Sequence, residues 1–454
     1  MRGGRVQRVA LVAAAAFAVS ACTPPPLANP PPADRFYWPG GVAHAAGAGE
    51  GTLYVASTNF DKRYDRGHLT AVALDEVGLP PFGGTGEISE LTDLKLGSDG
   101  VLEIQSFAGE MVAWPQDGGT RLFVPSRAEG NPLQYADAVG AALSCPLAAE
   151  GRPQDCYTRA PSLTAAAASK TGVPRAPAPL GVTVSADGKV FVTHVQGADS
   201  PAGSGLSLRS YLVETSAEAP VIEPSLVSEG GSFLELGAGS GHAVAATPHW
   251  LYVTGRYVSA NGGELVRLVD RLHPGVIRSA GLEGAFHALE ARGLFVTDAG
   301  GAADRRRLFV AGRSPDVLLE AEVSGADSEA PVLSVMRVVA LPSQPNAVRA
   351  LPRAGGAPLL AIACTGAGKL VLYDAEVEAV VAQVSVGQQP FDVAVAAHGK
   401  GARLYVSNFG DGRVAVVDVP DLATPGEARL VAHLGKSQLC LVTPSDASCA
   451  GGGK

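Results

Sequence analysis

The segment from residue 390 to residue 419 limits the fold of this chain more than any other feature. It reads PFDVAVAAHGKGARLYVSNFGDGRVAVVDV, and its apolar residues alternate with small or polar ones over three short runs. A period of two is typical of half-buried strands, and the glycines between the runs supply tight turns. The segment therefore predicts an antiparallel β-meander. One meander leaves an apolar face uncovered, so further copies are needed to bury it.

Degraded copies of this meander recur upstream. The first copy opens at Pro39, which lies as far before Tyr54 as Pro390 lies before Tyr405. Alignment on the aromatic-Val pair of the second strand gives seven copies, with six or eight as alternative counts; the pairs begin at Tyr54, Phe123, Phe191, Tyr252, Phe309, Ala361 and Tyr405. Stacked β units of this length close into a ring. The sequence therefore predicts an all-β fold, a single β-propeller of seven four-stranded blades over residues 36–435, followed by a tail at 436–454.

The last copy resembles the YVTN family of β-propeller repeats. That family opens the inner strand with Pro, turns on Gly, and carries Tyr-Val-x-Asn on the second strand and Val-x-Val-x-Asp on the third. Here these places are held by Pro390, by Gly399 to Gly401, by Tyr405 to Asn408 and by Val414 to Asp418. The match covers about thirty residues and loosens upstream. The resemblance implies a propeller; relatives of this architecture resemble lactonases, copper-bearing reductases or dehydrogenase subunits, so it implies no single activity.

The first residues of the chain read as an export signal. Three arginines within the first eight residues form a basic start, and residues 9–19 form an apolar run that is short for a bilayer span. Residues 19–22, Val-Ser-Ala-Cys, resemble a bacterial lipobox. This resemblance implies that residues 1–21 are a lipoprotein signal peptide and that Cys22 carries lipid as the new N-terminus. The alternative is an ordinary signal peptide that ends near a cysteine.

The lipid anchor sets the expected location. Residues 22–35 are rich in Pro and predict an extended spacer between the membrane and the propeller. Thr23 is not acidic, and in this respect it resembles the residue after the lipidated cysteine in lipoproteins that are sorted to the outer membrane. We therefore expect a cell-envelope protein, held at the outer membrane through lipid.

The charge balance argues against a nucleic-acid partner. Removing the three signal arginines from the 35 basic residues leaves 32, against 44 acidic residues. Binding to a phosphate backbone requires clustered Lys and Arg. The only basic run is Arg305 to Arg307, which we expect to be a solvated turn.

An exported chain can form disulfides, and the cysteine spacing suggests two. Cys145 and Cys156 belong to an insertion around residues 143–179, rich in Ala, Pro and Ser, which we expect to be a long excursion between blades. Cys440 and Cys449 belong to the C-terminal tail. Each pair is close enough in sequence to form a local disulfide. Metal thiolates are the competing interpretation, but they would require His or Cys neighbours at short spacing.

No catalytic motif stands out, so the sequence predicts no catalytic residue, no metal site and no cofactor. The candidates for a functional constellation are three histidines. His44 and His242 fall on or near inner strands, where side chains of different blades converge on the channel, and His194 ends the second strand of its copy. They lack an evident carboxylate partner.

Other polar residues are expected to serve turns or strand ends. These residues are Asn59, Asp270, Asp298, Asp304, Asp316, Asn408 and Asp418. Cys364 is expected to be a small buried residue.

Two classes of function remain open. The first is a membrane-anchored, extracytoplasmic propeller that acts as a binding or scaffold module for a protein or glycan partner at the cell envelope; a structural component that resembles archaeal surface-layer propellers is a variant of it. The alternative is an exported propeller enzyme, a lactonase-like hydrolase or a redox protein, with its site at the channel mouth. The absence of motifs favours binding only mildly, because propeller active sites are built from scattered single residues.

The lipid anchor leads to a direct test. Cys22→Ser should release the folded protein from the membrane fraction, because every segment after residue 22 reads as a globular chain without a membrane span. Fractionation and mass spectrometry of the N-terminal peptide measure this. Membrane association that survives the substitution, with no lipid on the wild-type chain, would contradict the lipobox interpretation.

Overall fold

The computed structural model describes most of the propeller body. The described residues are 29–47, 49–127, 133–146, 156, 179–194, 209–216, 234–238, 240–255, 265–273, 276–280, 282, 290–297, 304–353 and 355–438. Cys22, Cys440, Cys449, Asp298 and most of the expected insertion lie outside these ranges. Within them, no helix is long and apolar enough to cross a bilayer.

Seven antiparallel sheets, here called blades one to seven, follow one another along the chain. Blade one contains β1 (Pro39–Ala45), β2 (Thr52–Ser57), β3 (Gly67–Ala73) and β5 (Val101–Ile104). Blade two contains β6 (Val112–Gln116), β7 (Gly119–Pro125), β8 (Leu133–Val139) and β9 (Ala142–Ser144). Blade three contains β10 (Pro179–Val184), β11 (Lys189–His194), β12 (Arg209–Ser216) and β13 (Leu234–Ala238). Blade four contains β14 (Ser240–Ala246), β15 (Trp250–Gly255), β16 (Val266–Asp270) and β17 (Ile277–Ser279).

The last three blades have the longest strands. Blade five contains β18 (Glu290–Val296), β19 (Arg305–Arg313), β20 (Val317–Ser324) and β21 (Val332–Ala340). Blade six contains β22 (Pro345–Leu351), β23 (Leu359–Cys364), β24 (Lys369–Asp374) and β25 (Ala379–Ser385). Blade seven contains β26 (Pro390–His398), β27 (Gly401–Asn408), β28 (Arg413–Val419) and β29 (Arg429–Leu434). Two short 3-10 helices, η1 (Leu74–Glu76) and η3 (Pro425–Glu427), lie in connections.

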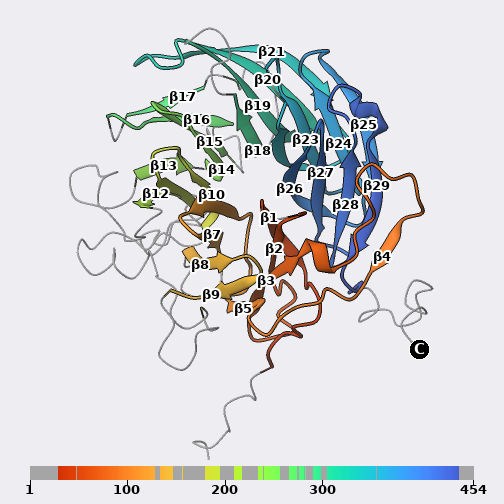
Figure 1. Cartoon of the computed structure of the whole chain (residues 1–454). Coiled ribbons are helices and arrows are strands. Elements are labelled where there is room, and N and C mark those ends of the chain that lie inside the picture. Colours follow the sequence, from red (N-terminus) through yellow and green to blue (C-terminus); the bar gives the residue numbers. More distant parts are fainter. Residues whose placement is uncertain are drawn as a thin grey trace, which may run out of the picture. The chain divides into compact units, whose positions relative to one another are not determined.

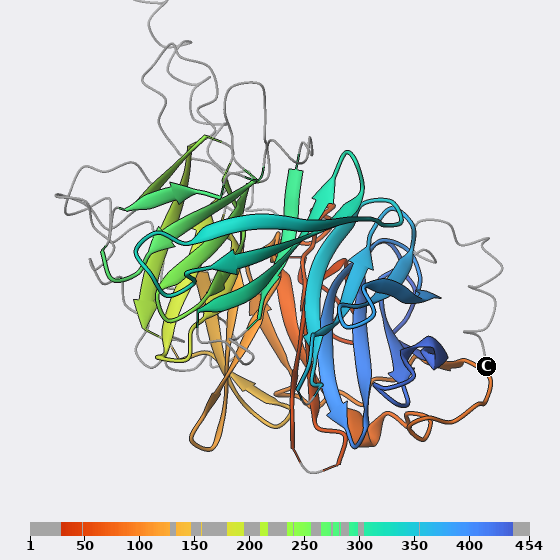
Figure 2. The same ribbon diagram turned by 90° about the horizontal axis from the view of Figure 1, so that it is seen from above.

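The blades stand around a common axis (Figures 1 and 2). The first strand of each blade is the innermost, and these strands contact one another in the order β1, β6, β10, β14, β18, β22, β26 and back to β1. Apolar side chains fill the spaces between blades, as where Leu372 of blade six and Leu404 of blade seven share one cluster. The all-β, seven-bladed propeller predicted from the repeats is confirmed.

Hydroxyl groups join the inner strands of neighbouring blades. Thr193 of β11 accepts the N–H of Gly181 in its own blade at 3.0 Å and donates to the carbonyl of His242 in blade four at 2.8 Å. Thr254 of β15 repeats this pattern: it accepts from the Ala243 N–H at 2.9 Å and donates to the Arg292 carbonyl in blade five at 2.8 Å. Each hydroxyl therefore satisfies a buried donor and a buried acceptor on two different blades.

The same hydroxyl bridge closes the ring. Ser407, in the second strand of blade seven, accepts the N–H of Asp392 at 3.0 Å and lies 3.5 Å from the carbonyl of Gly40 in blade one. At these junctions the backbones approach very closely. A Cβ on Gly181 would lie 2.1 Å from the carbonyl oxygen of His242, so this position excludes every larger residue.

A strap from blade one holds blade seven. The strap is the connection between β3 and β5, and it contains β4 (Ser89–Leu91). β4 pairs in parallel with the outer strand β29, so that Ser89 lies opposite Ala432 (Figure 1). At the strap, the fully buried Arg403 and Asp418 pair at 2.7 and 3.0 Å, and Asp418 also accepts the N–H of Gly83 at 2.9 Å.

The two ends of the propeller meet. A contact between them is made by Gln438, which lies beyond residue 435, the predicted end of the propeller. Gln438 is buried; its Oε1 accepts the N–H of Trp38 at 2.9 Å, and its Nε2 donates to the carbonyls of Phe409 and Gly410 at 3.0 Å. The first residues of the expected tail therefore belong to the propeller.

The expectation that Arg305 to Arg307 form a solvated turn is wrong. The three residues begin β19. The buried Arg306 pairs with Asp327 at 3.0 Å, and Arg307 donates to the carbonyl of Ala375 in blade six at 3.1 Å and pairs with Glu320. Only Arg305 is largely exposed. The run looked like a basic patch because its acidic partners lie later in the chain, Glu320 on β20 and Asp327 in the turn after it.

The hydroxyl bridges can be tested with a pair of matched substitutions. Thr254→Val keeps the shape of the side chain but leaves the Ala243 N–H and the Arg292 carbonyl without their partner. It should lower the free energy of unfolding by about 2 kcal/mol, because each buried polar group without a partner costs about 1 to 3 kcal/mol.

Thr70 provides the control for this test. Its hydroxyl is buried and has no hydrogen-bond partner within the described ranges, so Thr70→Val should be close to neutral. Urea-unfolding midpoints of both variants measure the difference. Equal midpoints for the two variants would show that the bridges do not stabilise the ring.

Candidate functional site

A cavity of about 510 Å³ lies on the axis, between the inner strands. Its walls are mostly apolar and include Val182, Val244, Leu294, Val348 and Val393 from five different blades. Among the described lining residues, only Glu110 and Arg349 carry charge. Arg349 lies on the inner strand β22, one residue after the paired Val348, and Glu110 lies two residues before the inner strand β6.

A second cavity, of about 520 Å³, lies between the strap and the ends of the propeller. Its charged side chains pair with one another, Asp34 with Lys436 and Asp93 with Lys95. The side chains of Asp34, Asp93 and Lys95 are more than half exposed, so this hollow offers little that is held in place. We therefore take the axial cavity as the candidate site.

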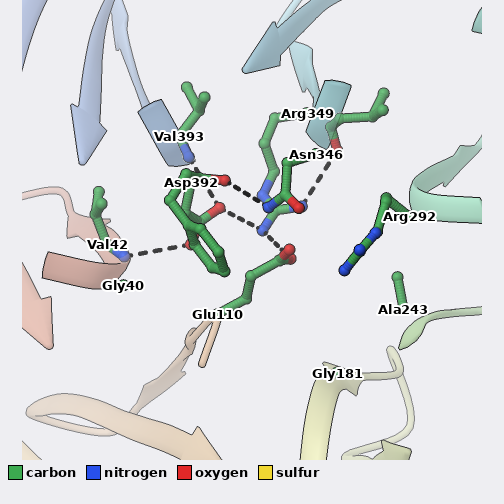
Figure 3. Close-up of polar contacts among 12 residues, drawn as sticks. Gly40, Val42, Glu110, Gly181, Ala243, Arg292, Asn346, Arg349, Asp392 and Val393 are labelled. Carbon is green, nitrogen blue, oxygen red and sulfur yellow. Dashed lines mark hydrogen bonds and ion pairs between the residues drawn. The ribbon is translucent and has the colours of Figure 1, made fainter. Parts of the chain in front are cut away.

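Three charged residues from three blades meet at the axial cavity (Figure 3). Arg349 of β22 donates through Nη2 to Asp392 Oδ1 of β26 at 2.6 Å and to Glu110 Oε2, just before β6, at 2.9 Å. Asp392 also accepts the backbone N–H of Val393 at 2.8 Å and that of Val42 in blade one at 3.3 Å. The cluster is thus held by blades one, two, six and seven.

Burial sets the electrostatics of this cluster. The side chain of Asp392 is fully buried, that of Glu110 is 13% exposed and that of Arg349 is 30% exposed. Burial raises the pKa of Asp392 above its ordinary value, although the Arg349 cation acts in the opposite direction. The pKa of Arg349 is raised: burial disfavours its charge, but the two carboxylates outweigh burial. Glu110 Oε1 is buried and has no hydrogen-bond partner in the described part of the chain.

A second ionic group borders the same space. Arg292 of β18 donates to Glu290 Oε2 at 2.9 Å, and its Nη1 lies 3.2 Å from Nε2 of the buried His242. Figure 3 shows the Arg292 side chain near Ala243. Asp392 lies on the other side of Arg349. Because Arg292 can only donate, His242 Nε2 accepts in this contact.

The three histidines singled out from the sequence do not form one group. His44 Nε2 lies 2.8 Å from the carbonyl of Glu50, and its ring stacks on Tyr405 at 5.8 Å. Burial lowers the pKa of His44. His242 contacts Arg292 instead, as described above. His194 ends β11, but its side chain lies outside the described part of the structure.

The polar residues expected at turns have mostly structural partners. Asn59 has a positive φ of 50°, and its side chain bonds the backbone N–H and carbonyl of Tyr64. Asn408 differs from the expectation, because it donates to the carbonyl of Val386 on the preceding loop at 2.6 Å and not to its own backbone. Asp418 is no strand terminator: it lies within β28 and forms the buried pair at the strap.

The remaining expectations concern Asp304, Asp316 and the cysteines. Asp304 and Asp316 are turn residues before β19 and β20; Asp304 is exposed and Asp316 is half-buried. Cys145 and Cys156 form the expected disulfide, with 5.4 Å between their Cα atoms. Cys364 is a buried free thiol, as expected, and burial raises its pKa to about 12.

Sequence reasoning missed Glu110, Arg349 and Asp392. A signal was present at one of these positions. Asp392 precedes the first paired valine of its inner strand, where Gly181 stands in blade three and Ala243 in blade four. A charged residue at a position that other copies fill with glycine or alanine indicates a special role at the axis.

Comparisons with known proteins support the fold alone. No protein-family model matches the chain, and no curated protein is similar to it in sequence. Among solved structures, Kuenenia stuttgartiensis hydrazine synthase is similar with a TM-score of 0.50 and 11% identity, over 84% of this chain and 96% of that chain. A nidogen/laminin complex has a TM-score of 0.37 with 12% identity, over 71% of this chain and 97% of that chain. A Mycobacterium tuberculosis puromycin-hydrolysing peptidase has a TM-score of 0.43 with 14% identity, over 89% and 55%.

Together, the closed ring of blades and the axial cavity define this protein as a β-propeller with a central site. The structural relatives include enzymes and binding proteins, and at such low identity they transfer no activity.

Replacing the cation tests the electrostatics of the cluster. Arg349→Met leaves Glu110 and Asp392 together without a positive partner. The loss of stability should be on the order of 2 kcal/mol at pH 8. The loss of stability should be smaller at pH 5. Asp392 has a raised pKa in the folded protein, so its protonated form stabilises the fold, and this contribution is lost as the pH rises.

Arg337→Met is the matched control. Arg337 pairs with Glu378 at the surface, and such exposed pairs contribute about 0 to 1 kcal/mol. Urea-unfolding midpoints at both pH values measure the two variants. A loss for Arg349→Met that is independent of pH, or no larger than that of the control, would contradict the assigned role of the cluster.

Proposed function

We propose that this chain is a membrane-anchored, extracytoplasmic β-propeller that acts as a binding module of the cell envelope and holds part of its ligand in the axial cavity. The observation that carries the proposal is Glu110. One of its carboxylate oxygens is buried without a partner in the described residues, beside a cavity of about 510 Å³. A buried acceptor without a partner gains a hydrogen bond when a ligand supplies a donor.

The cavity walls define the class of ligand. Val182, Val244 and Leu294 offer apolar contact to a hydrocarbon body. Two carboxylates share the Arg349 cation, so the cluster has a formal charge of −1 when both are ionised and favours an ammonium group over a carboxylate. The ligand is therefore an amine with an apolar body. A lysine side chain carries an ammonium group on an apolar stem, so a protein partner, one of the two kinds expected from the sequence, fits the site better than a hydroxylated glycan.

A hydrolase at the same place is the second candidate. It is favoured by two carboxyl groups beside one arginine, one of them with a raised pKa, because general acid–base pairs have this character. Asp392, however, is fully buried, and its oxygens are engaged by Arg349 and by the N–H groups of Val393 and Val42. Only Glu110 is left for a ligand, and the geometry therefore supports binding better than catalysis.

A thermal-shift series tests the binding proposal. The probes are alkylamines, alkyl alcohols and alkyl carboxylates of matched chain length. Amines should raise the melting temperature of the wild type by a few degrees, since ligand at a hundred times its Kd contributes about 2.7 kcal/mol. Glu110→Gln should abolish this response, because it removes the charge.

Glu329→Gln, at an exposed position, is the control and should respond as the wild type does. Equal responses to amines and carboxylates, or an unchanged response of Glu110→Gln, would refute the amine site. Alkyl esters and N-alkyl amides of the same chain lengths, which water can cleave into an acid and an alcohol or amine, are incubated in parallel. Mass spectrometry shows whether any is hydrolysed, and hydrolysis that depends on Glu110 would favour the hydrolase.

A further inference from the structure

A second group of potential ligands lies away from the channel, at the end of blade four where two turns meet. His249 lies in the turn between β14 and β15, Asp270 is the last residue of β16, and His273 follows in the next turn. One nitrogen of each imidazole and one carboxylate oxygen all lie within 4.8 Å of one another. Neither histidine was among the candidates from the sequence, because the two turns are brought together only by the antiparallel pairing of the blade.

Hydrogen bonding determines which nitrogen of His249 faces this group. Its Nδ1 lies 2.8 Å from the backbone oxygen of Asp327 in blade five. A carbonyl oxygen only accepts, so Nδ1 carries a hydrogen, and in the neutral imidazole Nε2 presents its lone pair. Nε2 is buried and makes no hydrogen bond in the described structure, while Asp270 Oδ1 lies 3.4 Å away. Two electron-rich atoms thus face each other, an arrangement that a cation bound to both would stabilise.

The distances fit a tetrahedral ion. Zinc binds imidazole nitrogen and carboxylate oxygen at about 2.0 to 2.2 Å, so two ligands of a tetrahedral ion lie about 3.3 to 3.5 Å apart. His249 Nε2 and Asp270 Oδ1 are separated by 3.4 Å, and His273 Nδ1 and Asp270 Oδ2 by 3.1 Å. The side chain of His273 is 58% exposed, which leaves its ring free to adjust. We propose that these three residues bind a divalent transition-metal cation of the Zn²⁺ type.

The surrounding contacts hold two of the ligands in position. Asp270 Oδ1 accepts the backbone N–H groups of Leu272 at 2.8 Å and His273 at 3.0 Å, which orient the carboxylate. The His249 ring stacks on Trp250 with an interplanar angle of 5°. A hydrogen bond from the distal imidazole nitrogen to a backbone carbonyl is the usual support of a metal-bound histidine. Two nitrogens and one oxygen suit Zn²⁺ better than Ca²⁺, which requires six to eight oxygen ligands.

The position of the site indicates what the ion does. Through Nδ1, His249 is bonded to the turn of blade five that carries Asp327, and Trp250 Nε1 donates to the carbonyl of Ser328 in the same turn at 3.0 Å. An ion on His249 therefore fixes two turns of blade four and, through this histidine, the junction with blade five. The exposed side of His273 leaves the fourth coordination position to water.

Calorimetric titration of the metal-free, purified full chain with Zn²⁺ tests the proposal, and Ca²⁺ serves as the comparison ion. Zn²⁺ should bind at one saturable site, and substitutions in this site should weaken the binding. Ca²⁺ should show no binding that these substitutions change. His273→Ala and Asp270→Asn should each weaken Zn²⁺ binding at least tenfold. Asp270→Asn keeps an oxygen acceptor for the turn, so its effect reports the lost carboxylate and not a lost fold.

His398→Ala is the matched control, because His398 is partly exposed and lies in blade seven. It should bind Zn²⁺ as the wild type does. A second measurement, the rise in melting temperature with Zn²⁺, should be retained in this control and lost in the other two variants. If no saturable binding occurs, or if His273→Ala and Asp270→Asn bind like the wild type, the proposal is overturned, and His249 and Asp270 are an ordinary ion pair.

Discussion

The ring depends on one interaction, the hydrogen bond that a Ser or Thr hydroxyl of one blade donates to a backbone carbonyl of the next. Thr193, Thr254 and Ser407 make this contact at three junctions, each from the residue after the aromatic-Val pair. At the Thr193 junction the inner strands approach so closely that a Cβ on Gly181 would lie 2.1 Å from the carbonyl oxygen of His242. The hydroxyl bridges thus hold together the inner strands that line the candidate site.

Asp392 shows how the site exploits this constraint. Its backbone N–H is bonded by the hydroxyl bridge of Ser407, so its Cα is fixed like those of Gly181 and Ala243 in other blades. The Asp392 carboxylate is fully buried at this crowded position. Its charge is compatible with folding because Arg349 and two backbone N–H groups hydrogen-bond to it. Glu110 completes the charge cluster from the start of blade two. The polar centre of the channel is therefore built on the positions that elsewhere provide close packing.

Much of the fold could be predicted from local patterns. The alternation in residues 390–419 indicated β26, β27 and β28. Six aromatic-Val pairs, with Ala361-Ile362 at the equivalent place in the sixth copy, marked the seven blades. The charged cluster as a whole could not be predicted, because Glu110, Arg349 and Asp392 are far apart in sequence and only the closed ring brings them together. β4 was missed for a similar reason. Its three residues carry no pattern of their own, and it is a strand only because β29 pairs with it.

The strap also has a consequence for the order in which the molecule is completed. β4 belongs to the connection inside the first blade, yet its pairing partner β29 ends at Leu434, near the end of the described chain. A growing polypeptide therefore cannot pair the strap of its first blade until the chain has been made as far as residue 434. Contacts between such distant segments form slowly because of the entropy of closing a long loop. Until they form, the outward faces of the first and last blades stay uncovered, and the incomplete ring is the form of the chain in greatest need of protection from aggregation.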